Sequence, residues 1–162
     1  MPTGVRERTP TKRELVAALS RVREATLRLV DPVEDAQLVR QVSPIMSPLV
    51  WDLAHIGWFE EFWLSRRLAD NEPSIERFDH LYDAFQHPRG ERSSLPILTP
   101  SEARAYLESV RRDALRVLED LRLDDSDPLL RDSYVYGLVL QHELQHQETM
   151  LQTLQLLSLI HI

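Results

Sequence analysis

Apolar residues recur at intervals of three and four along most of this 162-residue chain, and this spacing most strongly limits its fold. One face of an α-helix carries apolar residues at this period, whereas a half-buried strand carries them at every second position. A clear example joins Leu15, Leu19, Val22 and Leu29. Glycine, which weakens helices, occurs only four times. We therefore predict an all-α protein.

Proline after a capping residue marks the predicted helix starts. In the clearest case Thr99 is followed by Pro100 and Glu102, which together form a capping box with proline at the first helical position. Ser47 and Asp127 also precede a proline, so we expect both to cap helices. These capping residues mark where three of the predicted helices begin.

These signals predict long helices over about residues 10–30, 48–68, 100–122 and 128–157. Residues 70–98 are rich in turn formers and make a long connection between the second and third helices. Helices in this order predict an antiparallel four-helix bundle. The chain has the length of a single domain.

Composition excludes several classes of function. The formal charge of -7 and the pI near 5.3 argue against a nucleic-acid surface, which needs a basic patch. The chain has no cysteine, so any metal must be held by histidine and carboxylate. It also lacks an apolar run of about 18 residues and a signal-peptide pattern. We expect a cytoplasmic protein without a membrane partner.

The candidate metal ligands are three histidines. His142 and His146 lie one helical turn apart, so their side chains share a face with Cβ atoms roughly 5–6 Å apart. His55 lies on another predicted helix, and Asp52, one turn before it, is a candidate hydrogen-bond acceptor for a ligand. Three neutral imidazoles would leave coordination positions free for substrate, which is typical of a catalytic metal.

Other interpretations of these histidines stay open. The string HELQH fits the zinc-peptidase pattern, in which Glu143 would be the general base, but the only later histidine is His161. A metal-free helix can also carry two histidines by chance. His80 and His87 lie in the long connection, where solvated side chains are the simpler interpretation.

Three segments carry a resemblance to a known family. They are RQVSPIMSPLVWDLAHIGWFEEFWL, LYDAF with HPRGER, and YGLVLQHELQHQETMLQTL, within a match of about residues 12–158. On these segments the chain resembles the N-terminal DinB-like domain of the ergothioneine-biosynthesis sulfoxide synthases, or hercynine oxygenases (the EgtB family), which are non-haem iron enzymes. The resemblance implies a DinB-like four-helix bundle.

The resemblance also implies a site and a reaction. The family's iron ligands match His55, His142 and His146, with Fe(II) as the cofactor. The implied reaction uses O2 to join a small-molecule thiol, cysteine or γ-glutamylcysteine, to hercynine. Gln145 matches a glutamine that contacts the hercynine imidazole. Arg89 and Arg92 match a loop that holds the carboxylate of the thiol.

Members of the family carry a second, C-terminal domain resembling formylglycine-generating enzyme, which supplies the catalytic tyrosine. We expect residues 1–162 to be a single DinB-like domain and a fragment without that second domain, inactive on its own. Two alternatives stay open. One is a stand-alone DinB-like thiol transferase that uses zinc or nickel, and the other is a metal-free helical interaction domain.

Overall fold

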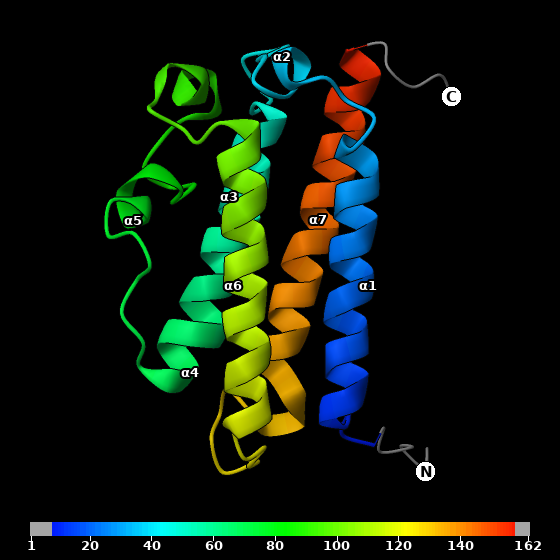
Figure 1. Ribbon diagram of the computed structural model, residues 1–162, viewed down its shortest axis with the longest axis vertical. Coiled ribbons are helices and arrows are strands. Elements are labelled where there is room, and N and C mark those ends of the chain that lie inside the picture. The colour runs from blue at the N-terminus through cyan, green and yellow to red at the C-terminus, as the bar shows by residue number, and fades with distance from the viewer. Residues whose placement is uncertain (1–7, 158–162) are drawn as a thin grey trace, which may run out of the picture.

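The computed structural model describes residues 8–157, and His161 lies outside them. Within that range every regular element is a helix, so the prediction of an all-α protein is confirmed. The long helices in Figure 1 are α1 (Lys12–Val30), α3 (Leu49–Glu60), α6 (Pro100–Asp120) and α7 (Tyr134–Leu156). No helix in the described part of the chain is both long and apolar enough to cross a membrane.

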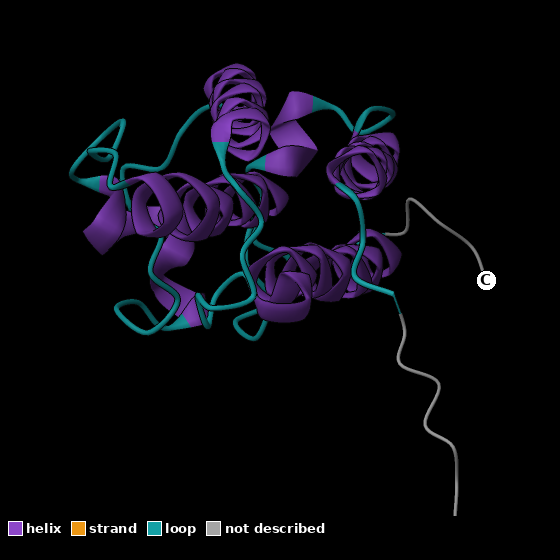
Figure 2. Cartoon of the chain, turned by 90° about the horizontal axis from the view of Figure 1, so that it is seen from below, coloured by secondary structure: helices purple, strands orange, loops and turns teal. Residues whose placement is uncertain are grey.

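The four long helices pack in two parallel pairs of opposite direction. In Figure 1, α1 and α7 both rise from the bottom of the view, whereas α3 and α6 descend. The most extensive helix pairs are α3 with α6 and α1 with α7, and α3 also packs on α7. Figure 2, turned by 90°, shows the helices closer to end-on. The contact between α3 and α7 matters most for function because both carry candidate ligands.

Two apolar clusters fill the interior between these helices. One surrounds the first half of α3 and includes Trp51, Leu53 and Tyr82. The other lies where α1, α6 and α7 meet and includes Leu19, Leu118 and others. Burying such side chains contributes about 1.5–3 kcal/mol each. The two clusters are the main source of stability for the packed helices.

Capping residues fix the ends of α1 and α6 as local chemistry predicts. Thr99 and Glu102 form the expected capping box at the start of α6, with Pro100 in the first turn. Thr11 and Glu14 form the same motif for α1, which begins at Lys12. Each box satisfies backbone N–H groups that have no partner within the helix.

The predicted cap of the second helix is wrong. Pro48 is the residue before α3, and the Ser47 side chain makes no capping bond. Its hydroxyl accepts a hydrogen bond from Arg92 Nη1 at 2.8 Å instead. The Ser47 hydroxyl is therefore bonded to the buried guanidinium of Arg92 and does not cap α3.

The predicted start of the fourth helix is also wrong. Asp127 caps a turn, because its carboxylate accepts from the N–H of Leu129. A short 3₁₀ turn, η3 (Arg131–Ser133), follows, and Asp132 and Ser133 have positive φ angles of 53° and 58°. Such left-handed residues cannot continue an α-helix. Helix α7 therefore begins at Tyr134, and its 23 residues span about 34 Å.

The chain between the long helices is not simple loop. Helix α2 (Asp35–Leu38) follows α1, and α3 continues into a π-helical turn, η1 (Glu61–Arg66), and then α4 (Arg67–Ala69). The long connection contains α5 (Phe78–Leu81) and the 3₁₀ turn η2 (Arg89–Ser94). Tyr82 of this connection is fully buried, and its hydroxyl accepts from the N–H of Leu98. The connection is thus anchored in the core beside α3.

Candidate metal centre

The structure brings the three predicted ligands together. His55 comes from α3, and His142 and His146 project from successive turns of α7. Each offers a nitrogen, and these ligand atoms lie within 4.8 Å of one another. The Nε2 atoms of His55 and His142 are 3.0 Å apart. Residues almost ninety positions apart in the sequence therefore meet at one point.

Two of the imidazoles contact a protein oxygen atom through Nδ1, the ring nitrogen that sets their orientation. The Nδ1 of His55 lies 2.7 Å from the carbonyl oxygen of Tyr82, so a neutral ring donates there and its Nε2 keeps a lone pair. The Nδ1 of His146 lies 3.2 Å from Asp52 Oδ1. Asp52 thus lies beside a ligand as expected, but it contacts the ligand of α7 instead of its neighbour on α3.

The rings of His55 and His142 are held in their neutral forms. Burial, with the positive charge that His146 and His142 would carry, lowers the pKa of His55 well below its usual value. Burial and the neighbouring His146 lower the pKa of His142 from 6.5 to about 3. Neutral imidazole is the form that binds a metal ion.

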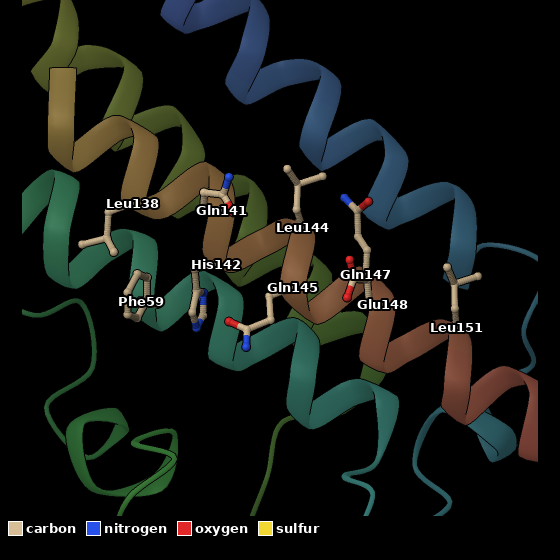
Figure 3. Close-up of a pocket in the computed structure, with 9 residues that line it drawn as sticks. All are labelled: Phe59, Leu138, Gln141, His142, Leu144, Gln145, Gln147, Glu148 and Leu151. Carbon is tan, nitrogen blue, oxygen red and sulfur yellow. The ribbon is translucent and has the colours of Figure 1, made fainter. Parts of the chain in front are cut away.

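Aromatic rings form the walls around the three histidines. The ring of Phe59 stacks on His142 with centroids 3.7 Å apart, and Trp51 stacks on His55 at 4.8 Å. His142 also borders a cavity of about 630 Å³ on the surface of α7, which Phe59 and Gln145 line as well (Figure 3). The site therefore combines aromatic walls with an open cavity beside His142.

The donor set fits a divalent transition metal. Nitrogen ligands lie about 2.0–2.1 Å from such an ion, and two ligands at a right angle are then about 3.0 Å apart. This is the spacing of the His55 and His142 Nε2 atoms. In addition, Asp52 Oδ2 is buried without a hydrogen-bond partner beside His146, which is costly for a carboxyl oxygen. A cation at the three histidines would relieve that cost.

Comparison with known proteins agrees with this geometry. Residues 18–150 match the DinB superfamily. The chain belongs to the DinB superfamily. Hercynine oxygenase from Mycolicibacterium smegmatis is 50% identical over 144 residues, which are 88% of this chain and 32% of that protein. The hercynine oxygenase from Mycolicibacterium thermoresistibile is 48% identical over 161 residues, 96% of this chain and 33% of that protein.

A third relative, hercynine oxygenase from Mycobacterium tuberculosis, is 48% identical over 145 residues, 88% of this DinB chain and 32% of that protein. The resemblance to the DinB-like domain of this family is thereby confirmed. The chain spans about a third of the length of these relatives.

The predicted substrate residues of this DinB domain occupy different environments. Gln145 is exposed and lines the cavity beside His142. Arg89 is exposed, and its Nη1 donates to the carbonyl oxygen of Ile45 at 3.0 Å. Arg92 is buried, with its guanidinium 3.7 Å from the centre of the Trp51 ring. The two arginines are close in the sequence but differ in burial, because Arg89 faces solvent and Arg92 lies in the interior.

Arg92 has protein partners on several of its nitrogen atoms. Its guanidinium donates to the Ser47 hydroxyl and to the carbonyl oxygens of His87 and Ala84. Because Trp51 stacks on His55, a single residue separates Arg92 from the candidate metal centre.

The peptidase interpretation of HELQH is not compatible with the position of Glu143. Its side chain is 1% exposed, and its carboxylate accepts from Arg23, Thr26 and Arg111. A carboxylate with these partners cannot act as a base on a metal-bound water at the histidines. His80 and His87 lie apart from the triad, with ring nitrogens 3.2 Å from each other.

Sequence reasoning missed two features of the DinB site. The carbonyl of Tyr82 has no sequence signal, because any residue can supply a carbonyl. The second feature is a buried cluster of Arg23, Glu60, Arg111 and Glu143 next to the histidines. A signal for it existed, since Arg23 and Arg111 each follow a core leucine by four residues and so fall on an apolar stripe.

Proposed function

We propose that this chain is the Fe(II)-binding domain of an oxygen-dependent sulfoxide synthase in ergothioneine biosynthesis. The enzyme would join cysteine or γ-glutamylcysteine to hercynine, with O2 as the oxidant. One observation carries the proposal. Three imidazoles from α3 and α7 meet at one point in a chain that is about half identical to hercynine oxygenases.

His55, His142 and His146 would hold the iron in this proposal. When bound, the ion would supply the redox chemistry that lets O2 react with a thiol. The chain's own contribution is to fix the donors before the ion arrives. Tyr82 and Asp52 set the ring orientations, and the Phe59 ring shields one face of His142 from water.

We assign substrate contacts to Gln145, Arg89 and Arg92. The amide of Gln145 can both donate and accept hydrogen bonds, which suits the imidazole of hercynine, and it lies in the cavity beside His142. A guanidinium binds a carboxylate with two parallel hydrogen bonds, which suits the thiol substrate. Arg89 and Arg92 lie on η2 of the long connection, which also delivers the Tyr82 carbonyl to His55.

The proposed architecture is a single DinB-like four-helix bundle over residues 1–162, antiparallel in the sense that α1 and α7 run opposite to α3 and α6, with the long connection between its second and third long helices. The relatives are about three times as long as this chain, which supports a second domain that completes the substrate pocket. Catalytic activity is accordingly proposed for the two domains together.

Metal analysis after anaerobic purification tests the proposal. We expect one iron per chain when Fe(II) is supplied, and none in a His55→Ala variant. His80→Ala is the matched control, because it removes a histidine outside the triad and should leave iron binding unchanged. Zinc or nickel bound in preference to iron would favour the thiol transferase instead. A wild-type chain that binds no metal would favour the interaction domain.

A further inference from the structure

Four buried charged residues, which we call the charge quartet, connect the four long helices. They are Arg23 of α1, Glu60 of α3, Arg111 of α6 and Glu143 of α7. Their side chains are between 0% and 10% exposed. Two positive and two negative charges cancel, so the quartet carries no net charge into the interior.

Each arginine of the quartet bridges both carboxylates. Arg23 lies 2.5 Å from Glu60 Oε2 and 2.8 Å from Glu143 Oε1. Arg111 Nε lies 2.6 Å from Glu60 Oε1, and its Nη2 lies 3.3 Å from Glu143 Oε2. The carboxylates therefore lie opposite each other with a guanidinium on either side. Because every member has two partners, no single helix can shift without lengthening several bonds.

The quartet is built on the two helices that carry the metal ligands. Glu143 directly follows His142, and its carboxylate is buried between Arg23 and Arg111. Glu60 directly follows Phe59, whose ring stacks on His142. The carboxylates of α3 and α7 are thus tied together within one residue of the contacts that form the site.

Register between α3 and α7 determines whether the histidines can share an ion. A slip of one residue along a helix moves side chains by about 1.5 Å and turns them by about 100°. The Nε2 atoms of His55 and His142 are 3.0 Å apart, so such a slip would remove one donor from the site. Apolar packing alone tolerates shifts better than charge-assisted hydrogen bonds do, because dispersion contacts have no preferred direction.

We propose that the charge quartet is the positioning device of the metal centre. It holds α3 and α7 in the register at which His55 faces His142 and His146. In this role Glu143, the acidic residue of HELQH, is a positioning residue that acts through the helix and does not touch the ion. The inference rests on the proposed metal binding, because it concerns the geometry of that site.

A purely stabilising quartet would behave differently. It would lower the free energy of unfolding when broken, yet the chain that remained folded would bind metal as before. A positioning quartet changes the site within the folded chain. Metal affinity and ligand-field spectra of folded protein therefore separate the two roles.

The test is a Co(II) titration of the anaerobic full chain, followed by visible absorption. In Glu143→Gln, which keeps the shape and removes the charge, we expect Co(II) affinity to fall by about 10-fold or more and the absorption bands to shift. Asp113→Asn is the charge control, because it removes a surface carboxylate of α6 that pairs with Arg116 and belongs to neither the quartet nor the histidine site. Leu118→Ala is the stability control, because it weakens the second apolar cluster without touching the quartet. Both controls should keep the wild-type spectrum.

A paired variant keeps the test decisive if Glu143→Gln does not fold. Combining Glu143→Gln with Arg111→Met removes one charge of each sign and should give the same loss of Co(II) affinity. Wild-type affinity and spectrum in a folded quartet variant would overturn the positioning role and leave the proposed function intact. A wild-type chain that fails to bind either Co(II) or Fe(II) would instead overturn the proposed function itself.

Discussion

Helices α3 and α7 hold two buried polar clusters side by side, the charge quartet and the histidine triad. In the quartet, guanidinium groups face carboxylates at 2.5–3.3 Å, so each member satisfies the others. In the triad, nitrogen atoms of three imidazole rings converge, and two of them are 3.0 Å apart. One cluster is complete within the protein, and the other is arranged for a cation from outside.

This difference shows how burial can be interpreted. A buried polar group normally has a partner, because desolvation is costly. The quartet follows that rule entirely with groups of this chain. The triad, with the orphaned Asp52 Oδ2 behind it, does not. Side-chain oxygens of Gln37, Ser133 and Tyr136 are also buried without partners, but Asp52 Oδ2 lies behind three converging donors. An incomplete cluster of this kind indicates a ligand, whereas a complete one indicates structure.

The largest expected effect is loss of the metal when a triad ligand is removed. His142→Ala should bind no stoichiometric iron, because it removes one of the three donors. With a chelator present, its free energy of unfolding should differ from wild type by only about 1 kcal/mol. Elemental analysis and urea unfolding measure the two quantities. Full iron occupancy in this variant would refute the assigned ligand set.

The second-largest expected effect is a loss of stability when one residue of the charge quartet is replaced. Glu60→Gln should lower the free energy of unfolding by about 3–5 kcal/mol, because it leaves two buried guanidinium groups with Glu143 as their only counter-charge in the quartet. Urea unfolding in chelator measures the loss. The exposed pair of Asp113 and Arg116 provides the control, and Asp113→Asn should change stability by less than about 0.5 kcal/mol. Equal losses in the two variants would show that burial does not distinguish these ion pairs.

Asp52→Asn tests the group behind the triad. It should lower iron affinity by about 10–100-fold, since the contact with His146 Nδ1 loses its negative charge. A competition assay with a chelator of known affinity measures the change, and Asp113→Asn again provides the control. Unchanged affinity would mean that Asp52 has no influence on the ligand.

The smallest effect is the pH dependence of the metal-free chain. Because burial lowers the pKa of His142 from 6.5 to about 3, the unfolded chain takes up a proton in this range that the folded chain does not. Stability should therefore fall as the pH drops below 6.5. Between pH 6.5 and 5 the contribution of His142 is about 1.5 kcal/mol. Unfolding curves of wild type and His142→Ala in chelator measure it, and parallel pH profiles would contradict it.

Local signals predicted the local structure well. The Thr99 capping box and the start of α6 at Pro100 follow from three neighbouring residues, and the structure confirms them. The starts of α3 and α7 were predicted less well, because distant or unusual backbone features decide them. Ser47 is bonded to Arg92, 45 residues away, and the left-handed Asp132 and Ser133 delay α7. A cap is predictable only while nothing distant competes for its side chain.

For the site itself, the sequence determined that His142 and His146 share a helix face, because a spacing of four residues fixes this in any α-helix. His55, on another predicted helix, was the third candidate ligand from the sequence, and the family resemblance implied that it completes the ligand set. Only the tertiary structure decided what surrounds them. The Tyr82 carbonyl reaches His55 from 27 residues away, and Asp52 reaches His146 across 94 residues. Glu143, adjacent to a ligand in sequence, faces Arg23, 120 residues distant. Such contacts depend on how whole helices pack, and packing is a sum over many side chains that no short motif contains.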